Sequence, residues 1–171
     1  NKPLSNRKPL YKIKDCDWII EAVSEKENIK KEVLDIIEKN KKKESIVSTN
    51  TSGLSINNLV KGRSKEFKEN FLGIHFFNPP RYMQLLELVN GKETTEETYD
   101  TMIKFGESIL GKGIVHAKDT PNFIGNRIGV YGMMTAINLA IEQGLTVEEI
   151  DKLTGPISGK PKSATFRTAD V

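Results

Sequence analysis

The sequence of 171 residues is poor in cysteine and histidine: it has one cysteine, Cys16, and two histidines, His75 and His116. A single cysteine excludes an internal disulfide framework and any metal site built from several cysteines, and it fits a reducing compartment. We therefore expect a cytoplasmic protein. No apolar run approaches the roughly 20 residues that a membrane span requires, and the first residues lack the apolar core of a signal peptide.

The excess of charge of one sign is also small. Lys and Arg total 26 against 23 Asp and Glu, which leaves a net charge of +3. This balance does not indicate nucleic acid or a membrane surface as a partner, and most of the positive residues are lysine rather than the arginine that phosphate and base contacts favour. The carboxylates and histidines form no cluster with metal-ligand spacing. We expect no nucleic acid, no membrane partner and no metal.

The first part of the chain alternates strand and helix patterns. Apolar runs at 15–23 and 44–48 flank an amphipathic helix whose start carries the capping-box pattern of Ser24 and Glu27. This order predicts a right-handed parallel βαβ unit, with the first strand buried on both faces. The other expected elements are a short helix at 56–60, a surface loop at 62–70, strands at 71–77, 85–89 and 114–117, and helices capped by Thr94 with Glu97 and by Thr146 with Glu149.

The pattern of the sequence changes at Thr120-Pro121. Thr as N-cap and Pro at the first helical position predict a long helical segment that runs to Gly144. We therefore expect two domains, an α/β domain over 1–119 and the beginning of a helical domain over 120–171. The α/β domain carries no G-x-G-x-x-G phosphate loop.

His75 is the first candidate for catalysis, because it lies near the carboxyl end of an expected strand, where open α/β sheets place their ligands. A lone histidine in an apolar strand is more often a core residue. Glu87, however, is the one acidic residue in the run 85–89, and a buried carboxylate is costly without a partner. We predict that the two side chains pair, which would fix the tautomer of the imidazole and raise its basicity. The alternative is an exposed Glu87 on an edge strand.

Three further polar positions follow expected strands or begin the long helix. The tripeptide Asn50-Thr51-Ser52 either places the Ser52 hydroxyl and amide donors at the same sheet edge as His75 or is an N-glycosylation motif, for which no secretory signal is present. Asn78 is either a site residue or an ordinary turn residue. Asn126 points either to the crevice between the domains or to solvent.

Five motifs, taken in order, resemble the 3-hydroxyacyl-CoA dehydrogenase family: Ile19-Ile-Glu-Ala-Val-Ser-Glu25, Ser48-Thr-Asn-Thr-Ser52, Gly73-Ile-His-Phe-Phe-Asn-Pro79, Glu87-Leu-Val and Lys118-Asp-Thr-Pro-Asn-Phe-Ile-Gly-Asn-Arg127. The resemblance covers nearly the whole chain. It implies an α/β fold, an incomplete Rossmann-like NAD-binding domain whose first βαβ unit is missing, followed by the start of an all-helical C-terminal domain. The stretch 154–171 resembles the longer members, in which the dehydrogenase is joined to an enoyl-CoA hydratase.

The resemblance also implies a reaction, the NAD-dependent oxidation of (S)-3-hydroxyacyl-CoA to 3-oxoacyl-CoA in fatty-acid beta-oxidation or butanoate metabolism. His75 would be the general base that takes the proton of the 3-hydroxyl, and Glu87 would orient it. Ser52 and Asn126 would hydrogen-bond the substrate oxygen.

For the cofactor, the resemblance implies that five residues line the nicotinamide and ribose side of NAD: Ala22, Glu25, Lys30, Ser52 and Asn78. The implied partners are an acyl-CoA substrate, a second copy of the chain in a homodimer, and a fused or associated enoyl-CoA hydratase. One alternative is a catalytically silent fragment or scaffold that keeps only fold and association surfaces. Another is a dehydrogenase of free hydroxy acids, which relies on a helical-domain lysine that the long helix here does not offer.

Overall fold

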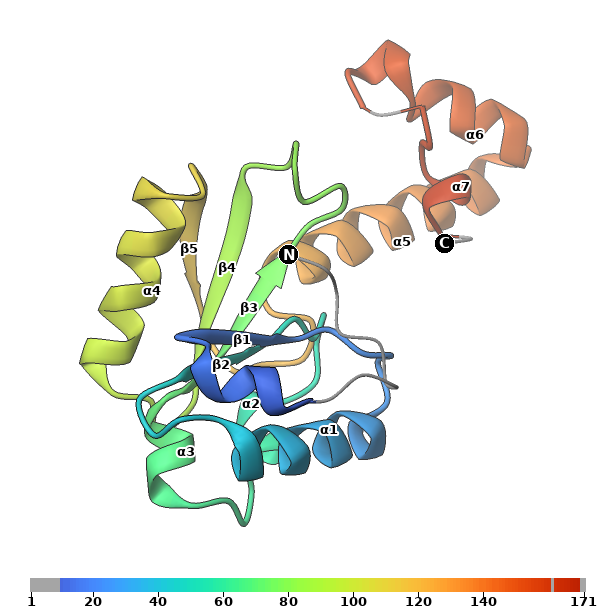
Figure 1. Cartoon of the computed structure of the whole chain (residues 1–171). Coiled ribbons are helices and arrows are strands. Elements are labelled where there is room, and N and C mark those ends of the chain that lie inside the picture. The colour runs from blue at the N-terminus through green and yellow to red at the C-terminus, as the bar shows by residue number, and fades with distance from the viewer. Residues whose placement is uncertain (1–9, 161, 170–171) are drawn as a thin grey trace. The chain divides into compact units, whose positions relative to one another are not determined.

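The computed structural model describes residues 10–160 and 162–169. They form two compact units that divide between Ile124 and Gly125. The first unit is built on a five-stranded sheet in the order β1-β2-β3-β4-β5 (Figure 1). Neighbouring strands are parallel except for β3 and β4, which are antiparallel. The strands are β1 (Trp18–Glu21), β2 (Ile46–Thr49), β3 (Phe71–Phe76), β4 (Leu85–Asn90) and β5 (Gly113–Ala117).

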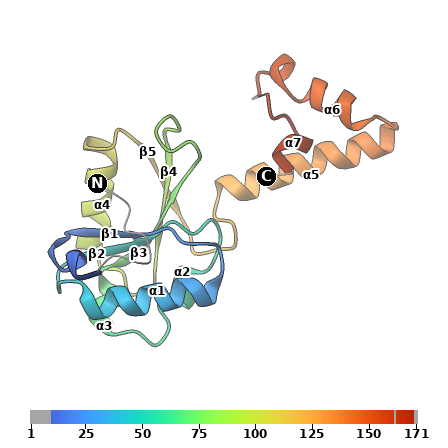
Figure 2. The ribbon, with the colours of Figure 1, turned by 45° about the vertical axis from the view of Figure 1, so that its right-hand side comes forward.

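Helices cover both faces of this sheet (Figure 2). On one face, Leu34 and Ile37 share a buried core with strand residues such as Val47. On the other, Met102 packs with Leu72 and further strand residues in a second core. The helices of the first face are α1 (Glu27–Asn40), α2 (Ile56–Leu59) and α3 (Lys65–Glu69), η1 (Leu10–Asp15) is a 3₁₀ helix beside α1, and α4 (Glu96–Ser108) covers the second face. The predicted α/β class is confirmed.

The alternation of side chains along the strands decides which residues can meet. In β3, Ile74 joins the core under α4 while Phe71 joins the core under α1 and α2, and in β4 the same holds for Leu88 and Val89. Because successive residues point to opposite faces, His75 and Glu87 both lie on the face that α1 and α2 cover.

The expectation of a first strand at 15–23, buried on both faces, is wrong in part. The strand is limited to Trp18–Glu21, and Ile20 is 43% exposed. The reason is that β1 lies at the edge of the described sheet. The α4 layer reaches only Trp18, whose ring meets the Phe105 ring nearly edge-on at 5.2 Å between centroids.

The predicted capping box of Ser24 and Glu27 is also wrong. Helix α1 begins at Glu27, and its N-cap residue, Lys26, makes no side-chain cap. The chain instead turns at Ser24, whose carbonyl accepts a hydrogen bond from the Lys26 amide at 2.7 Å. This turn lets the carboxylate of Glu25 reach the loop that follows β2.

Two further local expectations are wrong, each because of a short-range feature of the chain. The segment 62–70, expected as a loop, contains α3, which Ser64 caps and which buries Phe67. A helix of five residues is too short to show a hydrophobic period. Thr95 rather than Thr94 caps α4, because the Thr94 hydroxyl donates to the carbonyl of Phe71 at 2.5 Å.

The second unit contains α5 (Gly125–Gln143), α6 (Val147–Leu153), η2 (Pro156–Ser158) and α7 (Phe166–Ala169). The predicted capping box of Thr146 and Glu149 is confirmed. The long helix begins at Gly125, four residues after the predicted first helical position Pro121, since Asn122 and Phe123 take left-handed φ values of 61° and 45°. Among the described residues, no helix has the length and apolar character that crossing a membrane demands.

Candidate active site

His75 and Glu87 stand directly opposite each other on β3 and β4. The Nδ1 atom of His75 lies 2.7 Å from Oε2 of Glu87. The residues are 4% and 0% exposed, respectively. The predicted pairing is confirmed, and the alternative of an exposed Glu87 on an edge strand is wrong, because β5 pairs with β4 on its other side.

The second oxygen of Glu87 has a backbone partner. Oε1 accepts a hydrogen bond from the amide of Ile124 at 3.0 Å. Each carboxylate oxygen therefore has a donor, which offsets the cost of burying the charge. The rings of Phe77 and Phe123 flank the imidazole, with centroids 4.5 and 5.8 Å from its own.

The other ring nitrogen of His75 is differently placed. Nε2 makes no hydrogen bond to any residue that the structure describes, and in that part of the chain no buried side-chain nitrogen or oxygen lacks a partner. Nε2 therefore retains access to the surface. With Nδ1–H donating to the carboxylate, Nε2 carries the lone pair, so the pair can accept a proton from a bound hydroxyl.

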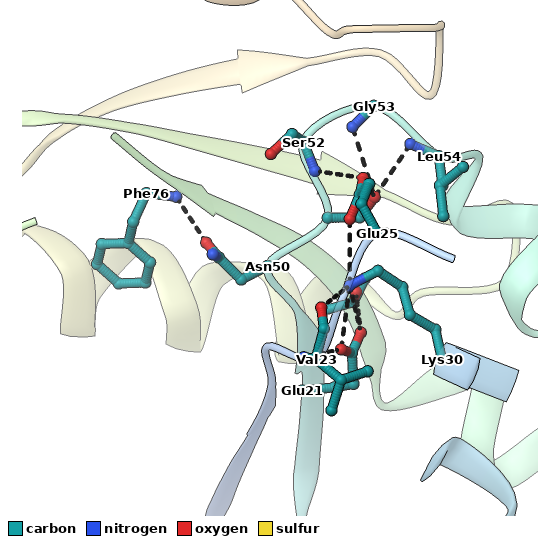
Figure 3. Close-up of polar contacts among 11 residues, drawn as sticks. Glu21, Val23, Glu25, Lys30, Asn50, Ser52, Gly53, Leu54 and Phe76 are labelled. Atoms are coloured by element: carbon teal, nitrogen blue, oxygen red, sulfur yellow. Dashed lines mark hydrogen bonds and ion pairs between the residues drawn. The ribbon is translucent and has the colours of Figure 1, made fainter. Parts of the chain in front are cut away.

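A second polar network lies at the carboxyl ends of β1 and β2 (Figure 3). Its centre is Lys30, a residue of α1 that is 1% exposed. The Lys30 Nζ lies 3.0 and 3.2 Å from the two oxygens of Glu21, 3.1 Å from the carbonyl of Val23 and 3.2 Å from Oε2 of Glu25. Lys30 thus joins the end of β1 to the carboxylate of Glu25.

Glu25 in turn fixes the loop after β2. Its Oε1 accepts hydrogen bonds from the hydroxyl of Thr51 and, at 2.8 Å, from the amide of Ser52. Burial alone raises the pKa of Glu25, but these two hydrogen bonds and the charge of Lys30 outweigh it, so the pKa lies below its ordinary value. On the other side of the loop, Asn50 Oδ1 accepts from the amide of Phe76 at 3.0 Å.

Comparison with known proteins identifies the family. Residues 2–120 match the family model described as 3-hydroxyacyl-CoA dehydrogenase, NAD binding domain. The chain belongs to the 3-hydroxyacyl-CoA dehydrogenase family. The matched residues include the sheet, the His75–Glu87 pair and the Lys30 network.

Individual members of the family are similar over most of the chain. A Bacillus subtilis protein named "Probable 3-hydroxyacyl-CoA dehydrogenase" is 52% identical over 160 residues, which are 94% of this chain and 20% of that protein. The fatty acid oxidation complex subunit alpha of Acinetobacter baumannii is 36% identical over 82% of this chain and 19% of its own length. The chain therefore spans about a fifth of the length of these two relatives.

A solved structure gives the same result for the fold. The (S)-3-hydroxybutyryl-CoA dehydrogenase PaaH1 from Ralstonia eutropha superposes with a TM-score of 0.75 at 32% identity. The match covers 83% of this chain and 49% of that chain. The sheet of the first unit is accordingly a Rossmann-like NAD-binding fold.

The remaining residues of the expected dehydrogenase site lie in different surroundings. Glu25, Lys30 and Ser52 belong to one hydrogen-bonded network, and Ala22 and Asn78 are exposed residues that follow β1 and β3. Asn126 belongs to the second unit, where it lines a pocket of mostly apolar character together with residues such as Gly129, Met133 and Thr165. Among the described residues, no group of three or more His, Cys, Asp or Glu is arranged to hold a metal ion.

Sequence reasoning missed two participants. Glu21 follows three apolar residues inside the run 15–23, so the burial cost that singled out Glu87 could also have drawn attention to it. The amide of Ile124, in contrast, is a backbone group that carries no residue-type signal, and only the path of the chain brings it to Glu87.

Proposed function

We propose that this chain provides the NAD-binding domain and the catalytic base of an enzyme that oxidises (S)-3-hydroxyacyl-CoA to 3-oxoacyl-CoA. The observation that carries the proposal is the His75–Glu87 pair, in which one imidazole nitrogen is held at 2.7 Å by a buried carboxylate and the other reaches the surface. Membership of the 3-hydroxyacyl-CoA dehydrogenase family supports the substrate class.

In this reaction Nε2 of His75 takes the proton of the substrate's 3-hydroxyl group. The negative charge of Glu87 stabilises the imidazolium that results, and the Ile124 amide keeps that carboxylate in place. A positioned general base of this kind contributes about 10²- to 10⁴-fold to the rate. NAD⁺, which the residues at the sheet edge would hold, would supply the acceptor for the hydride that leaves C3 as that carbon becomes a carbonyl.

The residues at the sheet edge fit the nicotinamide end of the cofactor. Ala22, Ser52 and Asn78 are exposed there, and the Glu25 side chain is 43% exposed. Lys30 is buried, and its Nζ already faces Glu21, Val23 and Glu25. Lys30 therefore acts on the cofactor through Glu25, whose carboxylate it orients. Ser52 and Asn126 hydrogen-bond the substrate oxygen in this proposal.

The relatives also support a setting for the reaction. One of them is named fatty acid oxidation complex subunit alpha, which favours fatty-acid beta-oxidation, or the related butanoate reactions, over the use of free hydroxy acids. In this proposal the protein is cytoplasmic, pairs as a homodimer, and works with a fused or associated enoyl-CoA hydratase.

The test is the oxidation of NADH by the purified protein in the presence of acetoacetyl-CoA. This is the reverse of the proposed oxidation, so His75 donates the proton to the carbonyl oxygen here, and we expect His75→Asn to lower kcat by about 10²-fold or more because that proton donor is lost. His116→Asn is the matched control: it removes the other histidine, whose Nδ1 lies 2.8 Å from the Tyr99 hydroxyl, and we expect its kcat to equal that of the parent. Equal turnover in His75→Asn and the parent would contradict the proposal. A parent without turnover would favour the silent scaffold instead.

A further inference from the structure

A single carboxylate anchors the segment that joins β5 to the second unit. Oδ2 of Asp119 accepts hydrogen bonds from the Ser55 hydroxyl at 2.9 Å, the Asn57 amide nitrogen at 3.0 Å and the Asn57 side-chain Nδ2 at 2.5 Å. Oδ1 accepts from the amide of Ile56 at 2.8 Å. Both oxygens are thus bound to the beginning of α2, which fixes where this segment starts.

A second contact holds the same segment a few residues later. A Cβ atom at Gly53 would lie 2.4 Å from Oδ1 of Asn122 and 2.9 Å from its backbone nitrogen. Gly53 therefore allows the loop after β2 to approach the segment more closely than any other residue would. Asn122 and Phe123 have positive φ values, and such a conformation persists only where its surroundings hold it.

The segment 119–124, which we term the anchored turn, ends beside the catalytic pair. Phe123 is 1% exposed and its ring lies next to the His75 ring. The next residue, Ile124, donates its amide to Oε1 of Glu87. The two ends of the anchored turn thus contact α2 and the buried carboxylate.

We propose that Asp119 is a positioning residue for the His75–Glu87 pair. By holding the anchored turn on α2, Asp119 delivers the Ile124 amide to Oε1 of Glu87, and this keeps Oε2 directed at Nδ1 of His75. Loss of that amide removes one of the donors that hold the carboxylate, so Oε2 holds Nδ1 of His75 less firmly and the tautomer of the imidazole is less well fixed. The effect on rate rests on the proposed function, whereas the effect on the imidazole does not.

The test replaces Asp119 with Ala in the full chain and follows the imidazole nitrogens by two-dimensional ¹H–¹⁵N NMR. In the parent we expect His75 as one tautomer, with the proton on Nδ1. In Asp119→Ala we expect a mixture of tautomers at His75, and exchange of the Ile124 amide that is at least about 10-fold faster, as for a locally opened segment. His116 serves as an internal reference whose signals stay unchanged.

Two further variants separate positioning from a general loss of stability. Thr95→Ala removes another helix cap, on α4, and we expect the His75 signals to keep the parent pattern. Gly53→Ala displaces the anchored turn from its other side, and we expect the same change at His75 as in Asp119→Ala. It also keeps the test available if Asp119→Ala does not fold.

The kinetic prediction is a split between constants. In Asp119→Ala we expect kcat to fall about 10-fold or more with KM little changed, because misplacement of a catalytic group acts on the chemical step. A folded Asp119→Ala protein with parental His75 signals and a protected Ile124 amide would overturn the proposal. If Asp119→Ala shows the NMR changes but the parent protein itself has no turnover, the positioning role stands and the dehydrogenase proposal fails.

Discussion

Glu21 and Glu87 are both buried carboxylates, and both lie on the face of the sheet that α1 and α2 cover. Glu21 ends β1, and its oxygens accept hydrogen bonds from Lys30, the amide of Val23 and the hydroxyl of Thr49. Glu87 lies in β4, faces Nδ1 of His75 and accepts a hydrogen bond from the amide of Ile124. Both charges are satisfied, so burial alone does not distinguish a structural carboxylate from a catalytic one.

The cation or base opposite each carboxylate makes the difference. Lys30 faces Glu21, Glu25 and a backbone carbonyl, so each of its three ammonium protons has an acceptor within the protein. His75 uses Nδ1 on Glu87, and its Nε2 remains available at the surface. The first pair holds two segments together, whereas the second can exchange a proton with a ligand.

The largest effect that separates the two pairs is expected from Glu87→Gln. The amide keeps the size of the side chain but removes the charge that stabilises the imidazolium, and its NH₂ group favours the wrong tautomer of His75. We expect kcat for acetoacetyl-CoA reduction to fall about 10²- to 10⁴-fold, the range for loss of general acid–base catalysis. Glu21→Gln is the matched control, and we expect it to keep most of kcat. A similar loss of kcat in both variants would erase the distinction.

The next effect is on stability. Lys30→Met leaves the charge of Glu21 buried with only Thr49 and Val23 as donors, so we expect the free energy of unfolding to fall by about 3–5 kcal/mol in urea titrations. Adding Glu21→Gln to this variant removes the unpaired charge, while its side-chain oxygen can still accept a hydrogen bond. The double variant should therefore recover part of the loss. If it is less stable than the sum of both single variants predicts, Glu21 is not the group that Lys30 compensates.

The elements of the sheet could be read from the sequence because each repeats its signal over several residues. The runs at 71–77 and 85–89 are largely apolar, and the acidic residue inside the second run indicated a partner on the first. The exact pairing required the antiparallel register of β3 and β4, which places His75 opposite Glu87. That the two side chains meet could be predicted without this register, from the neighbouring strands and the cost of burying a carboxylate.

The parts that sequence reasoning missed depend on single residues or on backbone groups. Which threonine caps α4 is decided by a hydroxyl that binds a strand carbonyl. The start of α5 is delayed because Phe123 enters the core of the first unit, which costs two left-handed residues. Neither signal repeats along the chain, so neither produces a period that a sequence pattern can reveal.

The smallest expected effect concerns Glu25, the carboxylate that links Lys30 to the loop after β2. Burial raises its pKa, but the Thr51 hydroxyl, the Ser52 amide and Lys30 bring it below the ordinary value of 4.5. A carboxylate whose pKa is lower in the folded state stabilises the fold fully above its unfolded pKa. This contribution is lost as the pH falls through the folded value.

We therefore expect Glu25→Gln to be less stable than the parent at neutral pH, and the difference to shrink as the pH falls below 4.5. Because 43% of the side chain is exposed, water screens its contacts, and the difference should stay below about 1 kcal/mol. Urea unfolding of both proteins across this pH range measures it, with Glu32→Gln as the control at an exposed position of α1. A difference that is constant with pH would show that the titration of Glu25 does not stabilise the fold.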